Sequence, residues 1–204
     1  MPRTADHDAR RRQVTDAVER LVADEGFGAV TVARTAALAG ISVGLVQHYF
    51  PSKDEMLRHA FTRLRDRLDE RVQAQVKRDD QAGARIEEIL LRALTELLPL
   101  DERRRREYRV ELAFTGRIAD NPRLAEVLAQ SNAQVRAALA QAVHNGKECG
   151  EVLAETDEVA AAGRLLALLD GLKLHVYGDP AAVAASDALA AELSRIFPGP
   201  CIKP

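Results

Sequence analysis

The chain has 204 residues, of which 47% are hydrophobic and 29% are charged, and its formal net charge is −2. This hydrophobic content excludes a disordered chain, and the near-neutral balance excludes a polycation that holds nucleic acid by bulk electrostatics. The apolar residues are mostly alanine, leucine and valine, and only 4% of the chain is aromatic. Because alternating strand-like segments bounded by turns are also absent, we predict an all-α fold.

Cysteine content and hydropathy predict where the protein works. Cys149 and Cys201 are too few for the disulfide framework of a secreted domain, and the charged N-terminus has no signal-peptide core. No apolar run reaches the roughly 18 residues that span a bilayer, because Arg164, Asp170 and Lys173 interrupt the longest one. We expect a cytoplasmic protein with no membrane partner.

The first predicted helix covers about residues 8–25 and ends at Gly26, a residue typical of helix C-termini. Arg10, Arg11 and Arg12 lie near its start. Arginines there either form a solvated helix end or reach a phosphate of a bound nucleic acid, and the charge pattern leaves both interpretations open.

Residues 31–50 have the spacing of two short helices joined by a tight turn. Thr31 is suited to cap the first helix, Gly40 supplies the left-handed residue that ends it, and Ser42 is suited to cap the second. This arrangement predicts a helix-turn-helix motif, in which the second helix enters the DNA major groove.

The second of these helices carries two different faces. Val46 and Phe50 fall one turn apart and anchor it to a core, whereas the opposite face is small or polar. Gly44 has no side chain to hold the backbone away from DNA. The residues expected to contact base edges are Val43, Gly44, Leu45 and Gln47. Leu45 is alternatively a packing residue.

A second group of side chains near this helix can donate hydrogen bonds to anionic phosphate oxygens. The residues expected to contact phosphates are Thr31, Ser42, His48, Tyr49, Lys53, Arg10 and Arg11. Outside this motif, His48 would be read as an ordinary surface histidine. Pro51 ends the motif, and Ser52 with Glu55 forms a capping-box pattern from which a long helix begins at Lys53.

Six more helices are expected, with residues 145–150 as a loop between the fourth and fifth. We predict them at about 53–79, 84–98, 103–119, 121–144 and 157–176, with a final helix from Asp179. The helix at 157–176 is apolar nearly all round, so we expect a second subunit to cover part of it in a homodimer. The predicted dimer-interface residues are Leu165, Leu169, Leu172, Val176, Leu189 and Leu193. The alternative is that these residues form the core of one chain.

The first quarter of the chain resembles the tetracycline-repressor (TetR) family of bacterial transcription regulators. The resemblance is carried by Gly26, Thr31, Val32, Ala36, Ala39-Gly40-Ile41-Ser42, Gly44, Tyr49-Phe50, Pro51-Ser52-Lys53 and Leu57. Residues 107–112 and 169–172 also look like the branch of choline-responsive repressors. The resemblance implies a helix-turn-helix domain at 1–52 and an effector-binding and dimerisation domain at 53–204. It further implies a repressor that leaves a palindromic operator when a small molecule binds.

Two positions depart from the family pattern. Thr35 stands where the family usually has isoleucine, so a hydroxyl there needs a hydrogen-bond partner in the core. Gln47 stands where tyrosine is common, and its amide can pair bidentately with an adenine edge. The preferred operator should therefore differ from that of tyrosine-bearing relatives.

The effector pocket implied by this resemblance should lie between helices of the larger domain. Its candidate lining residues are Tyr108, Glu111, Thr115, Asn132, Lys173 and His175, each of which is alternatively an exposed residue or one satisfied in the core. The scarcity of aromatic residues argues against a caged quaternary ammonium ligand.

No cofactor, metal site or enzyme activity is expected. The five histidines lack paired ligand spacing, and there is no nucleophile motif or phosphate-binding glycine loop. The alternative to a DNA-binding regulator is a helical small-molecule-binding or interaction module that does not read DNA. In that case the glycine turn would serve packing alone.

Overall fold

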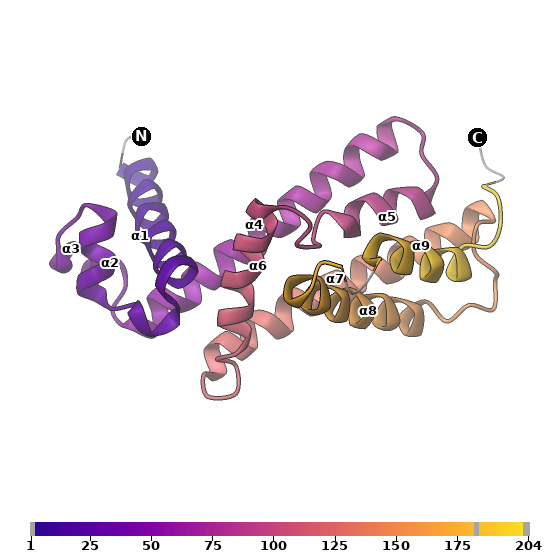
Figure 1. Cartoon of the computed structure of the whole chain (residues 1–204). Helices are drawn as coiled ribbons and strands as arrows, with labels where there is room; N and C mark the ends of the chain where they lie inside the picture. Colours follow the sequence, from indigo (N-terminus) through magenta and orange to yellow (C-terminus); the bar gives the residue numbers. More distant parts are fainter. Residues whose placement is uncertain (1–2, 182–183, 202–204) are drawn as a thin grey trace. The chain divides into compact units, whose positions relative to one another are not determined.

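The structure, a computed structural model, describes residues 3–181 and 184–201. Within those ranges it is all-α, as predicted, with nine α-helices, one 3-10 turn and no strand (Figure 1). The elements are α1 (Arg3–Glu25), η1 (Phe27–Ala29), α2 (Val32–Ala39), α3 (Val43–Tyr49), α4 (Lys53–Gln81), α5 (Ile86–Thr95), α6 (Glu102–Thr115), α7 (Pro122–Cys149), α8 (Glu158–Gly178) and α9 (Ala185–Ile196). In the described ranges, no helix is both long enough and apolar enough to cross a membrane.

The helices pack as two units. The N-terminal unit contains residues 1–66 with 106–129, and the C-terminal unit contains residues 67–105 with 130–204. The domain boundary predicted from the sequence, after residue 52, falls earlier, at the turn before α4. The boundary between the two packed units lies further along the chain because the first half of α4 buries its apolar seam within the N-terminal unit.

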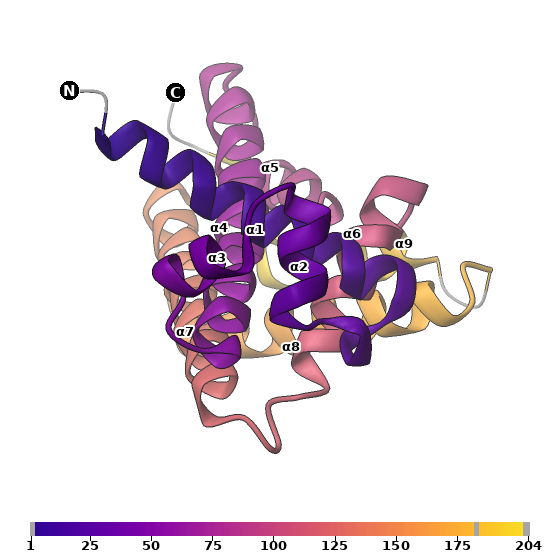
Figure 2. The ribbon, with the colours of Figure 1, turned by 90° about the vertical axis from the view of Figure 1, so that its left-hand side faces the viewer.

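Aromatic side chains and one ion pair hold the N-terminal unit together. The Phe61 ring stacks on Phe114 with centroids 5.0 Å apart, and Phe27 meets Phe114 edge-on at 5.4 Å. Beside them, the Arg65 guanidinium donates to the Glu111 carboxylate at 2.5 Å. Figure 2 looks onto α1, α2 and α3, which pack against one another in this unit. This core fixes the helix-turn-helix segment on the first part of α4.

At the start of α4, one of the two hydrogen bonds of the predicted capping box is present. The Ser52 hydroxyl accepts a hydrogen bond from the Glu55 backbone N–H at 3.1 Å, as the pattern predicts. The Glu55 carboxylate, however, accepts from Arg58 and pairs with Arg123 on α7. The Arg58 hydrogen bond is the largest cause that lowers the pKa of Glu55. The ion pairs of the Glu55 carboxylate therefore take the place of the hydrogen bond that a capping box would make from the Ser52 backbone N–H to this carboxylate.

Helix α7 continues through residues 145–149, so the predicted loop there is wrong. Gly146 lies inside this helix, and a Cβ at that position would come within 2.6 Å of Val152 Cγ2 and 2.8 Å of Phe197 Cε1. The glycine is needed for close packing and not for a turn. The predicted start of the last helix is also wrong, because Asp179 caps a turn by accepting from the Ala181 N–H, and α9 begins at Ala185.

Helix α8 is central to the core of the C-terminal unit, where it packs with α5, α7 and α9. The six residues predicted for the dimer interface are each no more than 5% exposed within this one chain. They are Leu165, Leu169, Leu172, Val176, Leu189 and Leu193. Helices from the same chain already cover these side chains, as the alternative of a one-chain core expects, and their part in a dimer interface stays a prediction.

Thr35 is fully buried, and its hydroxyl has no hydrogen-bond partner among the described residues. Because an unsatisfied buried hydroxyl costs free energy, Thr35→Val is expected to raise the free energy of unfolding by about 1–2 kcal/mol. Urea denaturation measures this change. Thr15 is the matched control, since it is equally buried but donates to the Arg12 carbonyl at 2.9 Å. Equal effects of Thr35→Val and Thr15→Val would contradict this explanation.

Candidate nucleic-acid interface

The predicted caps and turn of the helix-turn-helix motif are present. The Thr31 hydroxyl accepts from the Arg34 N–H at 3.2 Å, and the Ser42 hydroxyl accepts from the Leu45 N–H at 3.1 Å. Gly40 has φ 67°, the left-handed conformation that ends α2. These local contacts fix the direction in which α3 leaves the turn.

Helix α3 has the two faces that its sequence predicts. Val46 is fully buried and Phe50, its C-cap, is 6% exposed, so both anchor the helix. On the other side Val43 is 42% exposed, and Gly44 and Gln47 are exposed. A Cβ added at Gly44 would meet nothing within 4 Å. Leu45 is half-buried, between the two faces.

Three of the predicted phosphate-contacting residues lie at helix N-termini in the N-terminal unit. Thr31 and Ser42 are exposed, and because each accepts a capping bond through its oxygen, its hydroxyl hydrogen remains able to donate. Lys53 is exposed as the first residue of α4. A helix N-terminus and a lysine ammonium together favour an anionic oxygen.

The beginning of α1 lies against the end of α3. The His7 ring is 5.2 Å from the Tyr49 ring, edge-on at 83°, and 6.4 Å from the His48 ring. His48 and Tyr49 were predicted phosphate contacts, but His7 was missed. No local spacing connects His7 to α3, so only the tertiary fold shows that these three donors form one cluster.

Two arginines extend this cluster along α1. Arg11 is exposed, whereas Arg10 is half-buried and donates to the Gln13 side chain at 3.0 Å. Burial of the His59 ring beside Phe50 lowers the pKa of His59, and nearby Arg11 lowers it further. Because its ordinary value is about 6.5, His59 is mostly neutral at pH 7. Next to Phe50, positive charge therefore comes from Arg11 and not from His59.

The run of arginines at 103–106 does not add to this interface. Arg104 binds Asp101 and the Thr95 carbonyl, and Arg105 donates to the carbonyls of Val176 and Tyr177. Arg106 pairs with Asp24 at 2.7 Å. These guanidinium groups hold the chain's own helices together.

The six predicted effector-pocket residues are divided between the two units. Tyr108, Glu111 and Thr115 belong to α6 in the N-terminal unit, where Glu111 already pairs with Arg65. The other three, Asn132, Lys173 and His175, are in the C-terminal unit. Lys173 is buried there and His175 is exposed. Neither unit collects all six, and the pocket stays a prediction.

A capped two-helix motif with an exposed, small-residue face and neighbouring cationic groups defines a helix-turn-helix DNA-binding protein. Residues 14–60 match the model described as "Bacterial regulatory proteins, tetR family", and residues 86–197 match "BetI-type transcriptional repressor, C-terminal". The chain belongs to the TetR family of bacterial transcription regulators, with a C-terminal domain of BetI type. This confirms the family and the branch that the sequence resembles.

Individual relatives agree with this assignment. The HTH-type transcriptional regulator PksA of Bacillus subtilis is 29% identical over 183 residues, which are 90% of this chain and 86% of PksA. A transcriptional regulator from Rhodococcus sp. Rha1 has a crystal structure with a TM-score of 0.79 and 32% identity, over 92% of this chain and 96% of that one. A regulator from Saccharomonospora viridis, solved in complex with choline, shares the fold with a TM-score of 0.74 at 24% identity, over 97% and 100% of the chains.

Proposed function

We propose that this regulator is a homodimeric repressor that binds a palindromic operator through α3 and leaves it when a small molecule binds the larger helical domain. The observation that carries the proposal is the two-faced α3, buried at Val46 and open at Gly44. A two-fold dimer would place two such helices in successive major grooves. Effector binding would favour a conformer in which the two helices are wrongly spaced.

Base reading is assigned to the exposed side of α3. Gln47 projects a side-chain amide that can donate to and accept from an adenine edge, and Val43 offers methyl groups to a thymine methyl. Gly44 lets the backbone between them approach the base pairs. Leu45, which is half-buried, contributes at the edge of this contact.

Phosphate contacts are assigned to the groups that surround α3. They are Thr31, Ser42, His48, Tyr49, Lys53, Arg10 and Arg11, joined by His7 from the structure. These donors position the protein on the duplex without reading its sequence. Because only three of them are lysine or arginine, each subunit should release few counterions.

Gln47→Ala and Lys53→Ala separate these two roles. An operator is first selected from random duplexes with the full chain, and binding is then followed by fluorescence anisotropy at several salt concentrations. Gln47→Ala should relax the preference at one base pair by about 1–3 kcal/mol. Lys53→Ala should weaken all sequences alike and reduce the salt slope by about one. If both variants weaken all duplexes uniformly, the assignment of roles is wrong. If no duplex is selected, the non-reading helical module is favoured.

TetR-family regulators typically act as dimers, and α8 offers a face for this. Opposite its buried side, one stripe of α8 combines small residues with an exposed leucine. The stripe contains Ala160, Gly163, Ala167, Gly171 and Leu174. Leu174 is 51% exposed, and a Cβ added at Gly163 or Gly171 would meet nothing within 4 Å. Small side chains let helices approach closely, so we assign the dimer contact to this stripe.

The effector should not be a quaternary ammonium held in an aromatic cage within the C-terminal unit. That unit contains two aromatic residues, Tyr177 and Phe197. Phe197 is 2% exposed in the core, and the Arg105 guanidinium already lies 5.1 Å from the centre of the Tyr177 ring. Because a cage needs several open aromatic faces, we expect choline to give no heat in a calorimetric titration and no release of DNA.

A further inference from the structure

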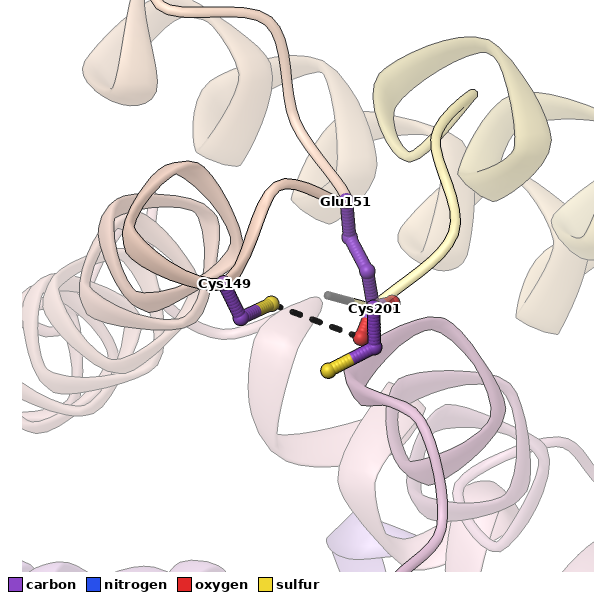
Figure 3. A group of neighbouring side chains, drawn as sticks. All are labelled: Cys149, Glu151 and Cys201. Atoms are coloured by element: carbon purple, nitrogen blue, oxygen red, sulfur yellow. Dashed lines mark hydrogen bonds between the residues drawn. The ribbon is translucent and has the colours of Figure 1, made fainter. Parts of the chain in front are cut away.

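Three side chains of metal-ligating type meet where α7 ends. Cys149 Sγ, a Glu151 carboxylate oxygen and Cys201 Sγ all lie within 4.8 Å of one another (Figure 3). Cys149 and Glu151 are buried, and Cys201 is exposed. The sequence pattern shows no such set, because Cys201 lies far along the chain from Cys149 and is brought back by the C-terminal tail.

We propose that Cys149, Glu151 and Cys201 bind a thiophilic divalent cation of the zinc class, with water as a fourth ligand. Two thiolates and a carboxylate are donors that zinc accepts in tetrahedral sites. With zinc–ligand bonds of about 2.1–2.3 Å, the edge of such a tetrahedron between sulfur and oxygen is about 3.6 Å. The distance from Cys149 Sγ to Glu151 Oε1 is 3.5 Å. Binding would displace the two thiol protons to solvent.

The Glu151 carboxylate is fixed by hydrogen bonds from a neighbouring helix. Its Oε1 accepts from the Ile86 N–H and its Oε2 from the Glu87 N–H, both at 3.2 Å, so it caps the N-terminus of α5. Each carboxylate oxygen has two lone pairs, and the Cys149 thiol donates to the second one on Oε1. A cation would take the place of that thiol hydrogen between sulfur and oxygen. The ligand is therefore oriented in advance by its own supporting contacts.

The tail that carries Cys201 is held in place by its backbone. The Gly199 N–H donates to the Glu151 carbonyl at 3.0 Å, and the Gly199 carbonyl accepts from Arg85 at 2.7 Å. A Cβ at Gly199 would come within 2.3 Å of the Gly150 carbonyl oxygen, so only glycine allows this approach. This close contact positions the tail and brings Cys201, the third ligand, to the cluster.

A divalent cation offsets most of the charge of the site. Two thiolates and one carboxylate sum to −3, which the cation reduces to −1. The Arg85 guanidinium, which also lies 3.4 Å from Glu87, faces this remaining charge. The Arg85 guanidinium lies 3.7 Å from Glu151 Oε2, the carboxylate oxygen that does not contact Cys149. A hollow of about 270 Å³ is lined in part by Arg85, Phe197 and the 198–200 segment that leads to Cys201.

The test uses the full chain, reduced and stripped with a chelator, then titrated with Zn²⁺ against a chelating indicator. We expect one Zn²⁺ per chain, and with Co²⁺ a tetrahedral spectrum with a thiolate charge-transfer band. Cys201→Ser changes an exposed residue and should leave the fold intact. It should weaken Zn²⁺ binding at least tenfold and diminish the thiolate band.

Gly199→Ala tests the same site without changing a ligand. It should weaken Zn²⁺ binding because the tail can no longer lie on Gly150. The control Gly28→Ala, where a Cβ meets nothing within 4 Å, should bind Zn²⁺ as the unmodified chain does. The proposal is overturned if the chain retains no Zn²⁺, or if Cys201→Ser binds it equally well. It is also overturned if peroxide joins the two cysteines in a disulfide in a protein that retains no Zn²⁺.

Discussion

Ala167→Glu is expected to split the proposed dimer and to lower operator affinity by about 100-fold or more, while the chain stays folded. Ala167 is exposed in the single chain and lies in the middle of the α8 stripe. A glutamate there suits an exposed helix but would bury an unpaired charge between two subunits. A single subunit carries only one recognition helix, so the contacts to the second half-site of the operator are lost. This loss accounts for the large effect on DNA binding.

Sedimentation velocity measures the oligomeric state, circular dichroism checks the fold, and anisotropy measures operator affinity. Ala74→Glu is the matched control, since it makes the same exchange at an exposed position of α4. It should remain dimeric. A dimeric Ala167→Glu variant would show that the subunits meet through another face.

Gly44→Ala is expected to stabilise the free protein and yet to weaken operator binding at least tenfold. The added methyl group meets no neighbour within 4 Å, and alanine is favoured over glycine inside a helix by about 0.5–1 kcal/mol. In the complex, the same methyl group would hold the backbone of α3 away from the base pairs. A variant that gains stability but loses DNA affinity would indicate that the backbone at Gly44 lies close to the base pairs in the complex.

Denaturation and anisotropy on one protein preparation give both quantities. Gly28→Ala, in η1 with equally open surroundings, is the control and should leave operator affinity unchanged. Unchanged affinity of Gly44→Ala would contradict the assignment of α3 to the major groove.

The parts of the structure that depend on neighbouring residues were predictable from the sequence. Thr31, Gly40 and Ser42 act within three or four residues of themselves, so their types and spacing specify the two short helices and the turn. The same holds for Asn121, whose side chain accepts from the Leu124 N–H at the start of α7. The buried partner of α3, Val46, follows from helical periodicity alone.

The parts that depend on distant residues were not predictable. The apolar circumference of α8 is the same whether it packs in its own chain or in a dimer, and only the positions of α5 and α9 decide that Leu169 is core. Gly146 looks like a turn residue until Phe197 is placed over it. His7 and Cys201 join their clusters through tertiary contacts that local spacing does not encode.

The internal use of arginine has a consequence for how the regulator searches a chromosome. Arg34 pairs with Glu25 at 2.6 Å, and Arg104, Arg105 and Arg106 bind acidic groups or carbonyls of their own chain. With a net charge of −2 per chain, DNA phosphates are met by the local cations Arg10, Arg11 and Lys53 and not by the surface as a whole. Because a dimer presents two sets of these cations, we expect its affinity for random duplex to fall steeply as salt concentration rises, and sliding on non-operator sequence to be confined to low ionic strength.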